Sequence, residues 1–109
     1  MKKFVFVYYG GTHEDKSPEE MKEIMDKWMA WFGTFADQQV DGGNPFAGNG
    51  KAVMKDGVHD IPQDMWPATG YTIINAEDID AATEIAKGCP GLDGDSEQCA
   101  VRVYEAMPM

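Results

Sequence analysis

The sequence predicts an α+β fold of the ferredoxin-like, split βαβ type, in which an antiparallel sheet carries two helices on one face. The first observation is the order of patterns along the chain: strand, helix, a hairpin-like pair, strand, helix and strand. The second is that two of the strands are apolar on both faces. A single domain of 109 residues has too few elements to cover both faces, so we expect a homodimer with two sheets face to face.

The first strand and the first helix have the clearest signals. The run Lys3–Tyr9 is built of Phe, Val and Tyr after the lysine, so both of its faces are apolar. Ser17 is an N-cap residue for a helix that begins with proline and covers Pro18–Asp37. Apolar side chains spaced by three and four residues predict that this helix packs on the sheet, and we interpret Trp28 and Phe32 as packing residues.

The middle of the chain is rich in glycine and proline. It contains two short strand-like pieces, Lys51–Met54 and Val58–Ile61. They flank Asp56–Gly57, a dipeptide that is typical of a hairpin turn. We therefore expect a hairpin-like pair between the two βα units.

The second unit repeats the strand and helix pattern. Gly70–Ala76 is a predicted strand, and Asp78 caps a helix that ends before Pro90. A closing strand covers Cys99–Glu105, where apolar and polar residues alternate. This alternation places Arg102 opposite the helix-facing side of the sheet or at its rim.

Composition excludes several classes of function. The net charge is -10 and the nine basic residues are scattered, so a nucleic-acid partner is not expected. The apolar run after Lys2–Lys3 is too short for a signal peptide or a membrane span, and we expect a cytoplasmic protein with no membrane partner. Cys89 and Cys99 lack any metal-ligand spacing, so we expect reduced thiols, no metal and no cofactor.

Several segments of the chain, taken in order, form one recognisable series. They are Ser17-Pro18-Glu19-Glu20-Met21, the Trp-rich helix, Asp41-Gly42-Gly43-Asn44-Pro45-Phe46, Gly70-Tyr71-Thr72-Ile73-Ile74, Lys87-Gly88-Cys89-Pro90 and Val101-Arg102-Val103-Tyr104. Together they resemble the YCII-related, or DGPF-domain, family. The resemblance covers nearly the whole chain and implies a single YCII-related domain over residues 1–109, which pairs into a dimeric α+β barrel. It also implies lyase-like or isomerase-like chemistry on small ring compounds, or regulatory association.

The name motif of this family, D-G-P-F-A-E followed by lysine, matches the chain at Asp60 and Pro62. An aspartate in an enclosed barrel can act as a general base, whereas an aspartate before x-Pro can also accept backbone N–H groups in a turn. His13 and His59 could each move a proton near neutral pH or remain solvated loop residues. Asp60, His13 and His59 are therefore the candidate catalytic residues.

The candidate substrate-binding residues are Arg102, Tyr8 and Tyr71. The planar guanidinium of arginine suits a substrate carboxylate, and the two tyrosines would line an aromatic interior. These residues favour a cofactor-independent lyase or isomerase acting on a small, aromatic or lactone-like acid. The alternatives are a non-catalytic ligand-binding homodimer and a regulatory homodimer with a filled interior.

Overall fold

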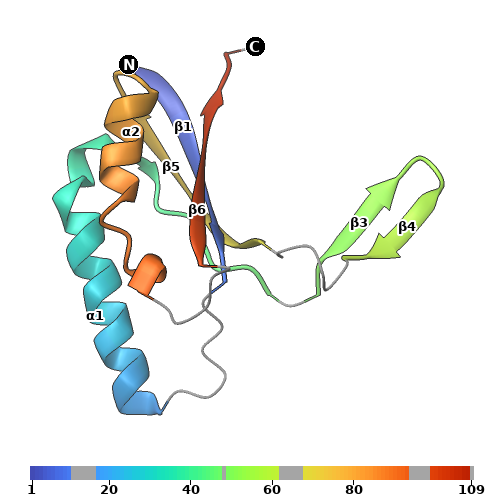
Figure 1. The fold of residues 1–109 in the computed structure, drawn as a ribbon, viewed down its shortest axis with the longest axis horizontal. Coiled ribbons are helices and arrows are strands. Elements are labelled where there is room, and N and C mark those ends of the chain that lie inside the picture. Colours follow the sequence, from blue (N-terminus) through green and yellow to red (C-terminus); the bar gives the residue numbers. More distant parts are fainter. Residues whose placement is uncertain (11–16, 48, 62–67, 94–98, 109) are drawn as a thin grey trace.

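The computed structural model of the protein describes residues 1–10, 17–47, 49–61, 68–93 and 99–108. Figure 1 shows the fold of these residues. The elements, in chain order, are β1 (Lys2–Tyr9), α1 (Pro18–Thr34), the 3-10 helix η1 (Ala36–Gln38), β2 (Gln39–Asp41), β3 (Lys51–Met54), β4 (Gly57–Asp60), β5 (Ala68–Ala76), α2 (Ile79–Ala86), the 3-10 helix η2 (Pro90–Asp93) and β6 (Ala100–Ala106).

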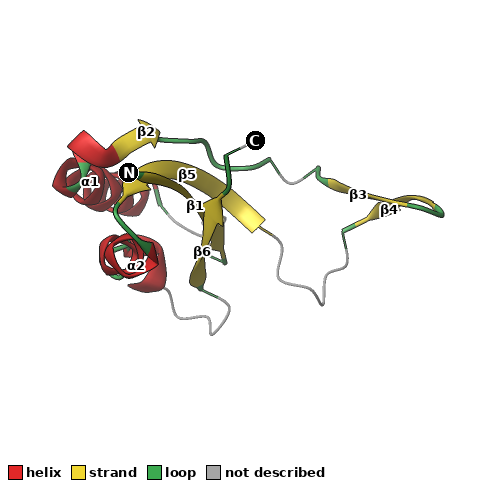
Figure 2. Ribbon diagram, turned by 90° about the horizontal axis from the view of Figure 1, so that it is seen from above, coloured by secondary structure: helices red, strands yellow, loops and turns green. Residues whose placement is uncertain are grey.

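The main sheet is antiparallel and has the strand order β2-β5-β1-β6. The two helices connect β1 to β2 and β5 to β6, which is the split βαβ arrangement of a ferredoxin-like fold. Figure 2 shows both helices on one side of this sheet. The fold class predicted from the sequence is confirmed.

The fourth strand of the sheet is β2, and sequence patterns alone did not identify it. Two of its three residues pair with β5, Gln39 with Ile74 and Asp41 with Ile73, and the register shifts between them. Three residues are too few to show an alternation of polar and apolar side chains. In this part of the chain the sequence therefore indicated only the longer pair of strands downstream. That pair forms a separate two-stranded sheet, β3 with β4, which projects away from the main sheet (Figures 1 and 2).

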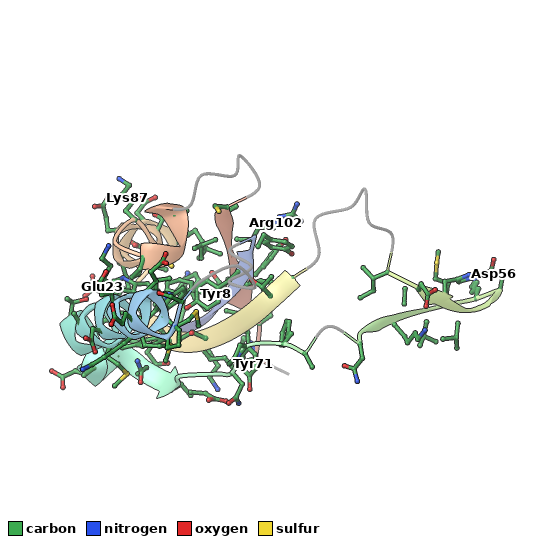
Figure 3. The ribbon with its side chains drawn as sticks, turned by 90° about the horizontal axis from the view of Figure 1, so that it is seen from below. Tyr8, Glu23, Asp56, Tyr71, Lys87 and Arg102 are labelled. Atoms are coloured by element: carbon green, nitrogen blue, oxygen red, sulfur yellow. The ribbon has the colours of Figure 1, made fainter. Side chains whose placement is uncertain are left out.

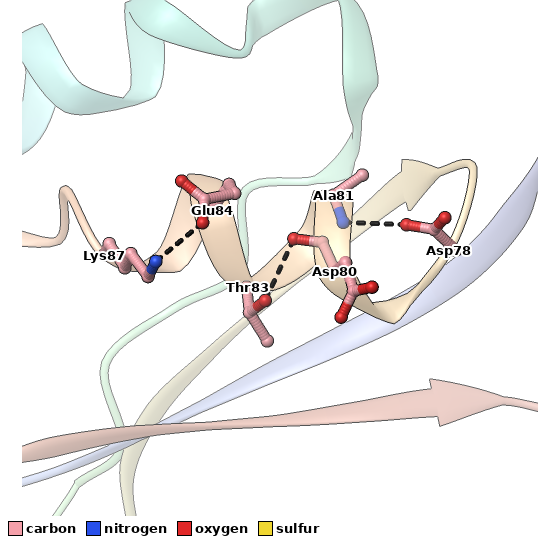
Figure 4. Close-up of polar contacts among 6 residues, drawn as sticks. All are labelled: Asp78, Asp80, Ala81, Thr83, Glu84 and Lys87. Atoms are coloured by element: carbon pink, nitrogen blue, oxygen red, sulfur yellow. Dashed lines mark hydrogen bonds and ion pairs between the residues drawn. The ribbon is translucent and has the colours of Figure 1, made fainter.

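The helix starts agree with the capping signals in the sequence. The Ser17 side chain accepts a hydrogen bond from the Glu20 N–H at 3.2 Å. The Asp78 side chain accepts one from the Ala81 N–H at 2.8 Å, at the start of α2 (Figure 4). Helix α1 ends at Thr34, three residues before the expected end, because the chain tightens into the 3-10 helix η1 after Phe35.

The core lies between the helices and the sheet, and Trp31 is at its centre. Its ring centroid lies 6.2 Å from that of Phe6 on β1 and 4.7 Å from that of Phe35. Its indole Nε1–H donates to the Ile85 carbonyl oxygen of α2 at 3.0 Å. Trp28 and Phe32 pack against this core but are only partly buried. One side chain therefore contacts the sheet and fixes α1 against α2.

No helix in the described ranges is long and apolar enough to cross a membrane.

The burial of Trp31 leads to the first prediction. Trp31→Ala should lower the free energy of unfolding by about 3 to 5 kcal/mol, because it removes a buried ring and leaves a cavity in the core. Trp28→Ala should cost less, about 1 to 2 kcal/mol, since part of that ring is already in contact with water. Urea unfolding followed by circular dichroism measures both changes. Equal losses for the two variants would contradict the central position of Trp31.

Candidate functional site

Alternation along the strands divides the side chains of the sheet between two faces. Phe4, Phe6 and Ile74 are fully buried against the helices. The side chains between them point to the opposite face, which we call the distal face. It carries Val5, Val7 and Tyr9 from β1, Tyr71 and Ile73 from β5, and Arg102 and Tyr104 from β6.

Arg102 and Tyr71 lie in one row across the distal face. Val7 on the central strand pairs with Arg102 on one side and with Tyr71 on the other. Neighbouring strands are about 4.8 Å apart, so the Cα atoms of Arg102 and Tyr71 are about 10 Å apart. Val5, Ile73 and Tyr104 form the next row. Two polar side chains thus flank an apolar strip of the size of a small ring.

The Arg102 guanidinium is placed by two tyrosines. Its central carbon lies 4.6 Å from the centroid of the Tyr9 ring, a cation-π contact. Side-chain hydrogen bonding to Tyr104, with charge interactions involving Tyr9 and Tyr104, raises the pKa of Arg102. Arg102 remains exposed and Tyr104 is 49% exposed. The cation is therefore held in position and remains accessible to a ligand.

Tyr71, on the other side of the row, is supported by the segment that follows β2. The Phe46 ring stacks on it, with centroids 5.8 Å apart. The Tyr71 hydroxyl lies 3.5 Å from Oδ2 of Asp41, whose Oδ1 accepts from the Gly43 N–H at 2.9 Å. Gly43 has a φ of +75°, and a Cβ there would meet the Tyr71 carbonyl oxygen at 1.6 Å. This close approach requires glycine and keeps Phe46 over the tyrosine ring.

The third candidate binding residue, Tyr8, points to the helix side of the sheet. Its ring lies edge-on to Trp28, with centroids 5.1 Å apart. Its hydroxyl donates to Oγ1 of Thr72 at 2.7 Å, and Thr72 donates to the Gly42 carbonyl oxygen at 2.9 Å. Burial raises the pKa of Tyr8 above its ordinary value, the main cause being loss of solvent around the phenolate. The structure does not bring Tyr8 together with Arg102 and Tyr71.

The candidate catalytic residues Asp60 and His59 lie on β4, in the projecting hairpin. The Asp60 carboxylate is paired with the Lys51 ammonium across the hairpin, and its side chain is 86% exposed. His59 Nε2 lies 2.8 Å from Oδ1 of Asp56, near the hairpin tip. Figure 3 shows Asp56 far from Arg102, Tyr8 and Tyr71 in the same chain. His13 lies outside the described residues.

Sequence reasoning did not select Tyr9 and Tyr104, the two rings around Arg102. The signal was present, because Tyr104 is two residues from Arg102 on one strand and therefore shares its face. The contact with Tyr9 could not be predicted without the pairing of β1 with β6.

Among the described residues, no group of three histidine, cysteine, aspartate or glutamate side chains could hold a metal ion.

A separate hollow lies between the two helices, on the other side of the sheet. It has a volume of about 490 Å³ and is widely open. Its lining includes the buried Trp31, the half-buried Ile85 and the exposed Lys27 and Glu84. It therefore shares no lining residue with the row of Arg102 and Tyr71.

The protein is therefore a ferredoxin-like α+β domain with a cation and aromatic rings on the sheet face away from its helices. No protein-family model and no curated protein matches the sequence. A similar solved structure is 5-chloro-2-hydroxyhydroquinone dehydrochlorinase from Burkholderia phenoliruptrix AC1100, in complex with 2,5-dihydroxybenzoquinone. The TM-score is 0.58 at 13% identity, over 96% of this chain and 93% of that chain. The two proteins share a fold.

The buried Tyr8 hydroxyl leads to a prediction on pH dependence. An unfolded chain ionises tyrosine near pH 10, as model peptides do, whereas folded Tyr8 keeps its proton to higher pH. The stability due to Tyr8 is therefore complete below about pH 10 and is lost as the pH rises further, by at most about 1.4 kcal/mol per pH unit. Tyr8→Phe should flatten this fall. Urea unfolding of both proteins between pH 8 and 11.5 tests it, and identical slopes would contradict it.

Proposed function

We propose that the protein is a homodimer that binds a small, planar, acidic ligand between two distal faces and acts on it as a cofactor-independent lyase or isomerase. The observation that carries this proposal is the position of Arg102 between Tyr9 and Tyr104, with Tyr71 across the central strand on the same largely apolar sheet face. A guanidinium supported by aromatic rings suits an anionic group attached to a flat ring.

The same face supports the proposal of a dimer. Val5, Val7 and Ile73 are only partly buried, although each belongs to a central strand of the sheet. Two such faces packed together would remove this apolar surface from water and would enclose the row between Arg102 and Tyr71. Enclosure also strengthens the attraction between Arg102 and an anion, because the local dielectric constant falls.

The chemistry proposed for this site is a proton transfer. In a lyase step, a base takes a proton from the ligand, a double bond forms, and a leaving group departs from the adjacent carbon. Asp60 is the proposed base, and His59 or His13 the proposed acid that protonates the leaving group or returns the proton in an isomerisation. Arg102 would hold the acidic group of the substrate, with Tyr71 against its ring.

The alternative is a binding or regulatory homodimer that uses the same distal face without turnover. Asp60 is exposed and paired with Lys51, which favours this alternative. Proton abstraction near neutral pH needs a desolvated carboxylate, and Asp60 within one chain is not desolvated. The two functions are distinguished by measuring whether a bound ligand is consumed.

The oligomeric state provides the first test. Sedimentation at micromolar concentrations should give a dimer, and Val7→Asp should give a monomer, because a carboxylate in the middle of the contact would be buried without a partner. Met25→Asp is the matched control, since it puts the same charge on an exposed apolar residue of α1. A monomeric wild-type protein would overturn the proposal of a shared interior.

Ligand binding provides the second test, with 2,5-dihydroxybenzoquinone as the probe because the structurally similar enzyme was solved with it. A thermal-shift titration should raise the melting temperature of the wild-type protein, as any ligand of the native state does. Arg102→Gln should weaken binding by about tenfold or more, the range of a lost charge-assisted hydrogen bond. Lys22→Gln on α1 removes one positive charge elsewhere and should leave binding unchanged.

A further inference from the structure

We infer that each β3–β4 hairpin packs on the second copy of the chain and brings the Lys51–Asp60 pair to the partner's distal face. Each site would then combine Arg102 and Tyr71 of one copy with Lys51 and Asp60 of the partner subunit. This inference rests on the proposed homodimer and extends it, because it makes every site incomplete within a single chain.

The hairpin has large apolar side chains that no other part of the described chain covers. Val53 is 80% exposed, Val58 is 65% exposed and Met54 is 61% exposed. A two-stranded hairpin alone in water is marginally stable, and three or more strands or a packed face are normally needed. Figures 1 and 2 show this hairpin projecting from the body of the molecule. Its apolar side chains are therefore best explained by a surface that another copy provides.

The register of the hairpin decides which polar groups accompany its apolar face. Val53 pairs with Val58 and Lys51 pairs with Asp60, and residues that face each other in an antiparallel pair share one side. Lys51 and Val53 are two residues apart, so all four side chains lie on the same side of the hairpin. Packing the two valines on a partner necessarily carries the Lys51–Asp60 pair to that surface.

The distribution of charge also favours a contact between the hairpin and the distal face. Helix α1 carries four carboxylates and two lysines, and residues 77–87 carry four carboxylates and one lysine. In the hairpin, Lys51 and Lys55 balance Asp56 and Asp60. The distal face adds the cation of Arg102. Two chains of charge -10 can approach with least repulsion through the hairpin and the distal face, away from the helices.

The area of the sheet supports a role for the hairpin in the contact. Four strands of about seven residues cover roughly 20 Å by 25 Å, or about 500 Å² per copy and 1,000 Å² for two. The real sheet is smaller, since β2 has only three residues. Stable obligate dimers bury about 2,000 Å² or more in total. Two exchanged hairpins would supply much of the difference.

In the part of the chain that the structure describes, the distal face also lacks a group that the proposed reaction needs. Among the described residues, the carboxylate next to this row is that of Asp41, which is engaged by the Gly43 N–H and the Tyr71 hydroxyl. Asp60 can serve as the base only if the hairpin meets an enclosed surface. Within its own chain the hairpin points away from Arg102 and Tyr71 (Figure 3).

Hydrogen exchange tests the packing of the hairpin without any ligand. In the dimer, the amides of β3 and β4 should exchange at least about tenfold more slowly than in a sample diluted to monomer, since local opening controls the rate. Val53→Asp should abolish this difference, whereas Met29→Asp, on a position of α1 that is 65% exposed, should retain it. Fast hairpin exchange at every concentration, with β1 protected, would overturn the inference while leaving a dimer formed by the sheets alone.

Mixed dimers test the shared site. One variant is Arg102→Gln, and the other combines Lys51→Gln with Asp60→Asn, which leaves the net charge unchanged. Each alone should bind 2,5-dihydroxybenzoquinone about tenfold more weakly than the wild type. In an equal mixture half of the dimers are hybrids, and each hybrid has one intact site when Arg102 and the hairpin come from different copies. Calorimetric titration of the mixture should therefore recover about one strong site in four.

Two outcomes of the mixing experiment would overturn the inference. The first is no recovery of strong sites in the mixture, which would mean that Arg102 and the hairpin act within one chain or do not act together. The second is wild-type affinity in the hairpin variant alone. If the wild-type protein does not bind the probe, the proposed ligand class fails, and the hydrogen-exchange result alone decides whether the hairpin crosses to the partner.

Discussion

Trp31 connects the sheet to both helices and so determines which face of the sheet the helices cover. Its ring packs on Phe6 of the central strand, and its indole N–H donates to the Ile85 carbonyl oxygen of the second helix. One residue thus holds α1 and α2 on the same side of the sheet. The consequence is a sheet with one face covered from within the chain and another that shows aromatic rings and a cation.

The sequence predicted those elements in which local chemistry and long-range packing agree. Ser17 and Asp78 cap the two helices through their own side chains, so the helix starts could be read directly. The hairpin was also visible, although the structure places its turn at Lys55–Asp56, with Gly57 as the first residue of β4. The short strand β2 was not visible in the sequence. Its place in the sheet depends on pairing with β5, and the strand has no residue pattern of its own.

The candidate site shows the limit of reading faces from a strand that is apolar on both sides. In β1, Tyr8 and Tyr9 look equivalent, since nothing in the run before them marks which parity faces the helices. The structure assigns Tyr8 to the side of Trp28 and Tyr9 to the side of Arg102. In β6 Arg102 lies between two valines, so polar and apolar residues alternate there. The side of the sheet on which Arg102 lies could therefore be predicted from the sequence.

A site divided between two copies would make ligand binding and assembly one equilibrium. A ligand that binds only the dimer stabilises it by RT ln(1 + [L]/Kd), about 2.7 kcal/mol at a hundredfold excess over Kd. The carboxylates of the helices would oppose association over longer distances, and salt screens such charges beyond about 10 Å at 0.1 M. The contact surfaces themselves, the hairpin and the distal face, carry little net charge. Moderate salt should therefore tighten the dimer, whereas an interface held by ion pairs would weaken.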